Sequence, residues 1–410
     1  MFDSVKSIFY VLCVLVLSTL PVWAVDMQAH MGTDEAQNAY SAYLNKQSAY
    51  YTDTYSPDAL RALVGNDLFG ALNALMGSTC RLASGFDYGT LRDAYVDVDK
   101  DLNINGNIIG YYDGASFSGI WDSGTTWNRE HTWPQSCFKG SNKKGTSIPM
   151  GYDMQSVRPA LISQNSSRGN TPYGESGSYY DPDEIKISNS LYSASNLGTY
   201  RGDCARVIIY DYVVYGKWGT YSNSLYRSEA KTDLQAQVGK ASCSVFESIP
   251  VLLKWHMSDP ISLTEMVRND GAQDYQGNRN PFIDYPELAI QMLKDANGVT
   301  TYPVTVTGVS MWPAYQLTLS SGFVAYLGTP NNRPASSDIV ITGATYTYDE
   351  SNGRLTIKKV SEAMTITGPY SATSNEQIQS AQSPAKFIRN GQILILNQGR
   401  TYNLLGQPIE

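Results

Sequence analysis

The pattern of apolar and polar residues divides the chain into a helical first part and a strand-rich last part. Residues 33–75 have the spacing of helices, and Ser56 followed by Pro57 marks the N-cap and first position of one of them. Residues 88–120 are rich in turn signals and predict hairpins, with a strand at 108–112. Apolar faces predict further helices at residues 201–215, 249–256 and 263–269.

After Gly298 the pattern changes to an alternation rich in Thr and Val, which is typical of strands. Asn352-Gly353 lies between two of these segments and is a strong hairpin signal. We expect a small β-sandwich-like module that resembles the bacterial Ig-like repeats of secreted proteins. Its predicted strands are residues 303–307, 339–342, 344–348, 355–357 and 364–367.

The middle of the chain predicts two strands joined by a polar loop. Residues 125–129 form the first strand, and Trp133-Pro134 ends its regular pairing just after His131. Residues 137–150 form the loop, and residues 153–158 form the second strand. This arrangement places His131 at the end of a strand.

A helix is predicted directly after the second strand. Pro159 is well placed as its first residue, and Gly169 after Arg168 is suited to a left-handed stop. Two strands followed by a helix form a ββα arrangement. The facing helix then carries Asn165 opposite the strand that ends at His131.

The candidate chemistry gathers in this ββα segment. Only three histidines occur in the chain, His30, His131 and His256, so few residues can act as a base near neutral pH. His131 follows Glu130 directly, and Asn165 lies downstream. A carboxylate, an imidazole and a carboxamide are groups from which a metal-assisted phosphodiester cut can be built. We expect His256 to have a structural role.

The local charge near these residues favours a polyanionic partner more than the net charge of the whole chain does. The 410 residues carry a net charge of −8, yet the window from residue 121 to residue 170 has a charge of +3. A basic island of this kind is compatible with phosphate binding, and a solvated charged face would look similar. The window holds the acids Asp122, Glu130 and Asp153 and the bases Arg129, Lys139, Lys143, Lys144, Arg158 and Arg168.

The first residues predict export. Lys6 precedes the apolar run 8–17, and Ala24 offers a small residue for cleavage, so residues 1–24 are expected to be a secretory signal peptide. A membrane anchor is the alternative, but the run is short for one and Pro21 breaks it. No later stretch is long and apolar enough to span a bilayer. We therefore expect the mature protein to be secreted, extracellular or attached at the cell surface.

The cysteines fit this compartment. Cys13 lies in the predicted signal peptide, and an even number of cysteines remains in the mature chain. Four cysteines in an exported protein favour disulfides, with three pairings open, and free buried thiols are the alternative. The four are Cys80, Cys137, Cys204 and Cys243.

The motifs resemble the bacterial endonuclease I group of His-Me finger (ββα-metal) nucleases. The resemblance covers roughly residues 33–296, and five motifs in order make it specific. Family members often have His and Asn after the Asp-Met pair, where this chain has Gln155-Ser156. The motifs are Arg129-Glu130-His131 with Trp133-Pro134, Asp153-Met154 with Pro159, Asn165 with Arg168-Gly169-Asn170, Arg201-Gly202-Asp203-Cys204, and Gln276-Gly277-Asn278-Arg279-Asn280-Pro281.

The resemblance implies an α+β fold, in which a ββα-metal core is embedded in helices and followed by the β module. It implies that His131 is the general base and that Glu130 and Asn165 hold one Mg²⁺, or another hard cation such as Mn²⁺ or Ca²⁺. The substrate is then nucleic acid, DNA first and RNA second, cut with little sequence specificity. Three residues are expected to contact the phosphate backbone: Arg168, Lys143 and Lys144.

The expected organisation is a signal peptide, a nuclease domain, a β module, a linker and a tail. The tail resembles the C-terminal sorting or attachment tails of exported Bacteroidetes proteins, and a plain terminal hairpin is the alternative. No protein partner is evident from the sequence. The boundaries are residues 1–24, 25–297, 298–370, 371–385 and 386–410.

Two other functions remain open. The chain could be an inactive nuclease fold that serves as a surface binding or adhesion protein, although intact Glu130, His131 and Asn165 argue against this. It could also be a glycan hydrolase that uses two carboxylates of the segment 181–184. Carboxylates so close in sequence more often cap a helix or pair with arginines.

Overall fold

The computed structural model describes most of the chain but not every segment. The predicted signal peptide, Lys143, Lys144, Cys243 and all but the last residue of the predicted linker lie outside the described residues. The described ranges are residues 34–81, 86–138, 149–184, 200–218, 221–222, 244–328, 332–369, 385–389, 392–397, 400–402 and 408–409.

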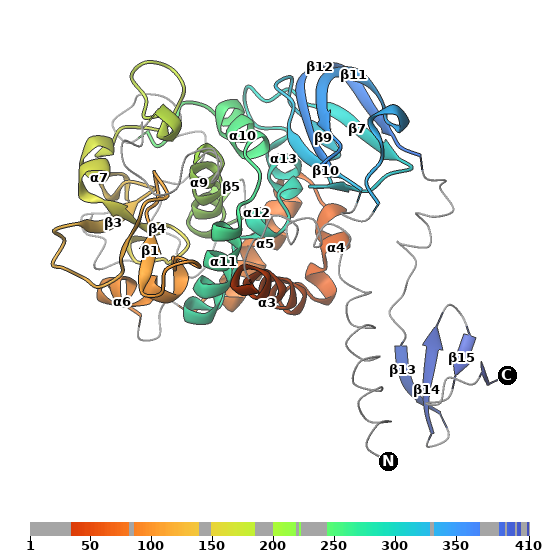
Figure 1. Cartoon of the computed structure of the whole chain (residues 1–410), viewed down its shortest axis with the longest axis horizontal. Helices are drawn as coiled ribbons and strands as arrows, with labels where there is room; N and C mark the ends of the chain where they lie inside the picture. Colours follow the sequence, from red (N-terminus) through yellow and green to blue (C-terminus); the bar gives the residue numbers. More distant parts are fainter. Residues whose placement is uncertain are drawn as a thin grey trace.

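Helices make up most of the first part of the chain, as predicted. Ser56 accepts a hydrogen bond from the backbone N–H of Ala59, and Pro57 is the first residue of its helix, as the sequence indicated. Every residue of α9 after Arg201 is buried, so this helix is the centre around which the others pack (Figure 1). The helices are α3 Asp34–Tyr50, α4 Pro57–Arg61, α5 Gly65–Thr79, α6 Tyr88–Val98, α9 Arg201–Tyr215, α10 Ile249–Ser258, α11 Leu263–Gln276, α12 Pro281–Asp284 and α13 Glu287–Leu293.

The helix α6 corrects the prediction of hairpins throughout residues 88–120. Asp87 and Thr90 form a capping box at its start, and one face of the helix is buried. Burial at every third or fourth position is the helical period, and it outweighs the turn signals further on. A hairpin does follow, with β1 Asn107–Ile109 antiparallel to β2 Ser116–Ser118, so the strand predicted at residues 108–112 ends at Ile109 and gives way to a turn. The buried residues of α6 are Leu91, Ala94, Tyr95 and Val98.

The predicted ββα segment is present. β3 Trp127–His131 pairs antiparallel with β4 Val157–Leu161, with His131 opposite Val157, and α7 Ile162–Arg168 follows at once. Gly169 ends the helix as expected, and its N–H bonds to the carbonyl of Asn165. Its φ of 56° and ψ of −113° are open to glycine but differ from the expected left-handed conformation.

The strand boundaries and the start of the helix differ from the prediction, and the second strand, expected at residues 153–158, spans Val157–Leu161. The first strand begins two residues later than expected, at Trp127. Pro159 lies inside β4, opposite Arg129, instead of at the start of the helix. Among the described strands β4 pairs with β3 alone, so it is an edge strand, where a proline without an N–H is tolerated.

The last large part is an all-β module, as predicted. The segments expected as separate strands merge into two long ones, and the Asn352-Gly353 turn joins them with a φ of 74° at Gly353. The strand order is β8-β10-β12-β7-β9, with β11 paired to β12, and the Ig-like identity stays a prediction. The strands are β7 Tyr302–Thr307, β8 Met311–Trp312, β9 Leu317–Thr318, β10 Val324–Leu327, β11 Val340–Asp349 and β12 Arg354–Thr367.

The β module and the helical part share one hydrophobic core. A single cluster of buried side chains includes Leu288 on α13 and also Leu319 and Ile357 of the module. Figure 1 shows α13 and α10 beside the strands of the module. The predicted boundary near residue 297 therefore divides the chain by secondary structure but does not separate two hydrophobic cores.

The C-terminal strands pair with one another in sequence order. β13 Ala385–Arg389, β14 Gln392–Asn397, β15 Arg400–Tyr402 and β16 Pro408–Ile409 form an antiparallel sheet. Four strands thus stand where the alternative was a simple terminal hairpin packed on the β module, and a sorting or attachment role for the tail stays a prediction. Within the described ranges, no helix has both the length and the apolar character that a membrane span requires.

Candidate active site

Glu130 is a buried carboxylate held by two donors. Its side chain lies in the penultimate position of β3 and is 2% exposed. Tyr112 donates its hydroxyl proton to Oε1 at 2.5 Å, and Arg168 on α7 donates from Nη1 to the same oxygen at 3.1 Å. Burial raises the pKa of Glu130, while the Arg168 guanidinium and the Tyr112 hydrogen bond oppose that rise. Both side-chain hydrogen bonds from described residues end on Oε1, and neither reaches Oε2.

Asn165 lies on the same side of the β3–β4 ribbon as Glu130. Its Nδ2 donates to Oδ1 of Asn128 at 2.5 Å, and the side chain is half-buried. Asn128 and Glu130 are two residues apart in a strand, so their side chains project from one face. Glu130, Asn165 and Arg168 therefore lie on the side of the ribbon that faces α7, and the metal-binding role expected of Glu130 and Asn165 stays a prediction.

His131 lies on the opposite face of the ribbon. Its ring stacks on Tyr88 of α6 with centroids 5.8 Å apart and an interplanar angle of 18°, and the side chain is 7% exposed. Its neighbour Glu130 faces α7, as alternation along a strand requires. The two residues are therefore adjacent in the backbone at the end of β3, while their side chains project from opposite faces.

The tautomer of His131 follows from its hydrogen bonds. Nε2 lies 3.0 Å from the backbone carbonyl oxygen of Gly151, which can only accept, so Nε2 carries the hydrogen. Nδ1 then has a free lone pair, and the amide of Gln135 lies 3.1 Å from it as a donor. The same amide is 3.1 Å from Nε2, but two donors do not bond to each other, so the Nδ1 contact is the hydrogen bond.

His131 is neutral at physiological pH. Its pKa is lowered to about 4, mainly by burial; the Gly151 hydrogen bond opposes this shift, and the positive charges of Arg129 and Arg168 add to it. A neutral imidazole with a defined lone pair is the form that a general base requires.

Arg168 is an internal residue rather than a surface phosphate ligand. It is 1% exposed, and Nη1 donates to the carbonyl of His131 at 2.9 Å as well as to Glu130. Nη2 donates to the carbonyl of Thr132 at 2.9 Å, and Nε donates to the carbonyl of Thr171 at 3.2 Å. The expected phosphate contact is corrected, because these bonds engage the guanidinium within the protein.

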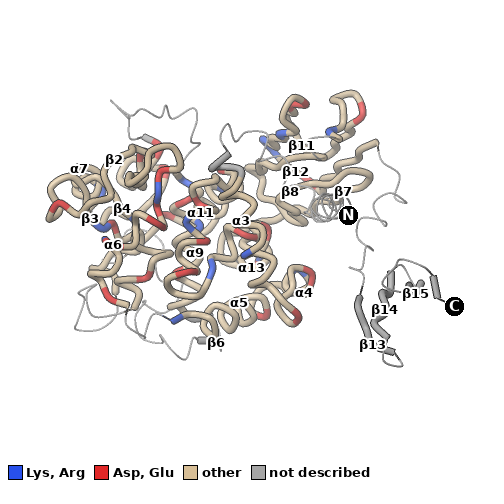
Figure 2. The backbone as a smooth tube through the Cα atoms, turned by 60° about the horizontal axis from the view of Figure 1, so that its bottom comes forward, with Lys and Arg blue, Asp and Glu red and all other residues tan. Residues whose placement is uncertain are grey.

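The basic window is less exposed than its sequence suggests. Arg158 is 4% exposed and, like Arg168, pairs with carboxylates inside the protein. Lys143 and Lys144, predicted to steer the backbone, lie outside the described residues. Along the described part of the chain, Figure 2 shows Lys and Arg interspersed with Asp and Glu. The charge of +3 in this window is therefore only partly available to a ligand.

Arg129 lies on the His131 face of the ribbon, and no role was expected for it from its motif. Its guanidinium lies 3.7 Å from the ring centroid of Tyr88 and 4.9 Å from that of Trp121, and it donates to the Tyr88 carbonyl at 2.8 Å. The two-residue period of a strand could have placed Arg129 beside His131, because residues 129 and 131 project from the same face. Tyr88 and Trp121 had no such signal, since only the fold brings them to β3.

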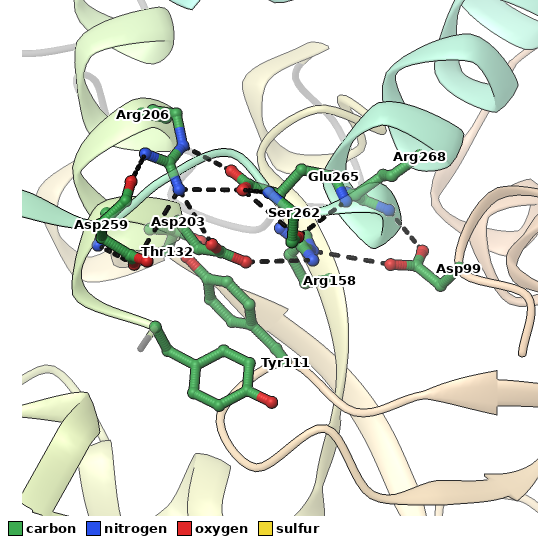
Figure 3. A network of polar contacts seen from close by, with 12 residues as sticks. Asp99, Tyr111, Thr132, Arg158, Asp203, Arg206, Asp259, Ser262, Glu265 and Arg268 are labelled. Atoms are coloured by element: carbon green, nitrogen blue, oxygen red, sulfur yellow. Dashed lines mark hydrogen bonds and ion pairs between the residues drawn. The ribbon is translucent and has the colours of Figure 1, made fainter. Parts of the chain in front are cut away.

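A network of buried ion pairs holds β4 against the helices. Arg158 lies 3.5 Å from Asp99, which also pairs with Arg268 of α11, as Figure 3 shows. Arg206 of α9 binds Glu265 at 2.5 Å within the same network. Arg268 also donates to the Val157 carbonyl at 2.9 Å, so the start of β4 is anchored directly. These contacts fix the ribbon that carries Glu130 and His131.

The oxygen donors present fit a hard divalent cation. Glu130 Oε2 accepts none of the side-chain hydrogen bonds described above, and Asn165 uses its amide nitrogen for Asn128, which leaves its carbonyl oxygen as a donor. One carboxylate and one amide oxygen suit Mg²⁺, which usually keeps several waters. Among the residues that the structure describes, no group of three or more His, Cys, Asp or Glu is placed to hold a metal.

The other candidate residues have structural partners. Asp181 and Asp183 both pair with Arg201, which accounts for these carboxylates without glycan hydrolysis. His256 is buried and donates from Nε2 to the carbonyl of Pro286 at 2.7 Å, in the structural role expected for it. Cys204 is a buried free thiol, so the disulfide expectation is wrong for this cysteine.

Comparison with known proteins gives a consistent match to one family. A sequence model described as endonuclease I matches residues 80–287, which include β3, β4 and α7. An extracellular ribonuclease of Bacillus amyloliquefaciens is 31% identical over 249 residues, which cover 58% of this chain and 77% of that protein. An extracellular ribonuclease of Bacillus subtilis (strain 168) matches with the same identity and coverage.

Proposed function

Because this chain belongs to the endonuclease I family, we propose that it is a secreted, metal-dependent nuclease that hydrolyses the phosphodiester backbone of DNA and RNA. The observation that carries the proposal is the β3–β4–α7 unit, in which a neutral His131 follows Glu130 at the end of β3 and Asn165 lies on the facing helix α7. Both relatives are named extracellular ribonucleases, and this supports secretion and the inclusion of RNA among the substrates.

His131 is the general base in this proposal. Its Nδ1 lone pair accepts a proton from the attacking water, while Nε2 keeps its hydrogen on the Gly151 carbonyl. That carbonyl holds the ring in one orientation and stabilises the imidazolium as it forms. The Gln135 amide contacts Nδ1 in this structure, so it has to turn aside before a water reaches the same lone pair.

Glu130 and Asn165 are the protein ligands of the cation. Mg²⁺, or a similar hard cation, supplies positive charge that stabilises the phosphate and the leaving oxygen. The two side chains position it at the end of β3, one residue from His131. Contacts of this kind read the phosphate backbone and not the base edges, so we expect little sequence specificity.

Cleavage assays on three forms of the protein test the proposal. Supercoiled plasmid and a structured RNA are incubated with wild type, His131→Ala and His256→Gln, each with Mg²⁺ and with EDTA. We expect wild type and His256→Gln to cut both substrates only with Mg²⁺, and His131→Ala to be slower by ~10²- to 10⁴-fold. Intact substrates in wild type with Mg²⁺ would refute the nuclease, and unimpaired cutting by His131→Ala would refute the base.

A further inference from the structure

Oε1 of Glu130 is already engaged by two protein donors. Tyr112 reaches it at 2.5 Å and Arg168 at 3.1 Å, and both side chains are 1% exposed. They approach from different elements, since Arg168 ends α7 and Tyr112 follows the strand β1. The carboxylate is thus fixed at one oxygen, and the other oxygen is the one that can meet a ligand.

The Tyr112 hydrogen bond has a defined direction. A carboxylate can only accept, so the single hydroxyl proton of Tyr112 goes to Glu130. The oxygen of Tyr112 also lies 2.6 Å from that of Tyr173, and with its own proton committed it must accept there. The result is a chain from Tyr173 to Tyr112 to Glu130, in which each bond strengthens the next.

Arg168 is held as firmly as the carboxylate it binds. Its four carbonyl contacts lie at the end of β3 and just beyond α7, and the guanidinium stacks on Tyr173 at 4.5 Å. The same tyrosine thus supports both donors of Glu130. Rotation of the Glu130 carboxylate would break both hydrogen bonds and leave a buried guanidinium incompletely paired, which is costly.

Asn165 has an equivalent partner in Asn128. The hydrogen bond from Nδ2 to Asn128 Oδ1 at 2.5 Å distinguishes the two ends of the Asn165 amide. The nitrogen faces β3, so the oxygen is the end available to a cation. Each proposed metal ligand therefore offers one oxygen, selected by a neighbour that does not itself bind the metal.

We propose that Tyr112, Arg168 and Asn128 are positioning residues that preset a two-oxygen cation site, with Glu130 binding through Oε2 alone and Asn165 through Oδ1. This inference rests on the proposed function, because it assumes that Glu130 and Asn165 are the metal ligands. Mg²⁺ and Mn²⁺ accept small errors in ligand placement poorly, so presetting the oxygens raises affinity. Loss of such partners typically weakens metal binding by ~10- to 100-fold.

Mn²⁺ binding to the full chain without nucleic acid tests the inference. Free Mn²⁺ is measured by electron paramagnetic resonance for wild type, Tyr112→Phe, Tyr173→Phe and Glu130→Gln. Tyr111→Phe is the matched control, because Tyr111 is equally buried and its hydroxyl contacts Thr132 instead of Glu130. Melting temperatures in metal-free buffer report folding, and cleavage rates are recorded against Mn²⁺ concentration.

We expect Tyr112→Phe to raise the Mn²⁺ dissociation constant by about tenfold and Tyr173→Phe to raise it by a smaller factor. Tyr111→Phe should bind Mn²⁺ like wild type. At saturating Mn²⁺ the cleavage rate of Tyr112→Phe should return toward the wild-type rate, which a general loss of structure would not allow.

Two results would overturn the inference. If Tyr112→Phe binds Mn²⁺ like wild type while Glu130→Gln binds it weakly, the positioning role of Tyr112 is wrong, and Glu130 remains the proposed metal ligand. If Glu130→Gln also binds like wild type, the ligand assignment of the proposed function fails together with the inference. If Tyr112→Phe does not fold, Tyr173→Phe decides in its place, and an unchanged dissociation constant refutes the chain of hydroxyls.

Discussion

At the scale of single residues, the proposed chemistry depends on which nitrogen of His131 carries the hydrogen. The Gly151 carbonyl fixes it on Nε2 at 3.0 Å, and burial keeps the ring neutral. Gln135 then donates to Nδ1, the atom that has to accept the proton of water. Its amide fills the position of a water and takes no part in the proposed proton transfer.

Replacing Gln135 with alanine tests this role of Nδ1. We expect Gln135→Ala to keep most of the cleavage activity, far from the ~10²-fold or larger loss expected when a base is removed. The ring remains tied to Gly151 in this variant, so its orientation does not depend on Gln135. Initial rates on plasmid at saturating Mg²⁺ measure the effect, and a loss as deep as that of His131→Ala would show that Gln135 is essential.

Sequence reasoning identified some residues of this site and missed others for a physical reason. Glu130, His131 and Asn165 stand in motifs, so their proximity could be predicted before the fold was known. Arg168 stands in a motif as well, but its burial depends on carbonyl acceptors that come together only on folding. Tyr112 reaches Glu130 across 18 positions of sequence, and no local pattern indicates that contact.

At the scale of elements, α6 determines how the His131 face is built. It carries Tyr88, which stacks on His131 and receives the Arg129 guanidinium. Because of turn signals around residues 99–106, hairpins were predicted in place of this helix, although the Asp87 cap and the apolar period were both present. Pro159 led to the opposite error, a helix predicted where the chain forms a strand. A proline suits both the first turn of a helix and an edge strand.

The capping box of α6 gives a test at this scale. We expect Asp87→Ala to lower the free energy of unfolding by more than Asp93→Ala does, because the backbone N–H of Thr90 loses its acceptor. Asp93→Ala is the control, since Asp93 lies mid-helix and is exposed. Urea unfolding at neutral pH measures both variants, and equal effects in the two would contradict the capping role.

At the scale of the whole molecule, one continuous core joins the helical part and the β module. The composition changes sharply near residue 298, which is why the sequence indicated two domains there. Whether side chains from both sides interdigitate cannot be read from composition. It depends on the packing of surfaces such as α13 against the strands, which only the fold defines.

Buried His256 makes stability depend on pH. Burial lowers its pKa to about 3, below the unfolded value of about 6.5, so between these values only the unfolded chain takes up the proton. The stability contribution is therefore complete above pH 6.5 and falls as the pH decreases toward 3. At pH 5 the loss is about 2 kcal/mol.

A variant separates this effect from that of the buried carboxylates. Their raised pKa values make the unfolding free energy rise as the pH falls, which is the opposite of the His256 effect. His256→Gln keeps a donor for the Pro286 carbonyl and has no titrating group. Between pH 7.5 and pH 5 we expect wild type to lose about 2 kcal/mol more unfolding free energy than His256→Gln. Equal losses in urea unfolding would show that His256 accepts a proton in the folded protein.

The most direct test of the central claim is the position of the bound cation. A crystal structure of the full chain with Mn²⁺, located by its anomalous scattering, would show which atoms coordinate it. We expect the ion within coordination distance of both Glu130 Oε2 and Asn165 Oδ1, at the end of β3. An ion bound elsewhere, with both oxygens outside its coordination sphere, would contradict the metal site and the mechanism built on it.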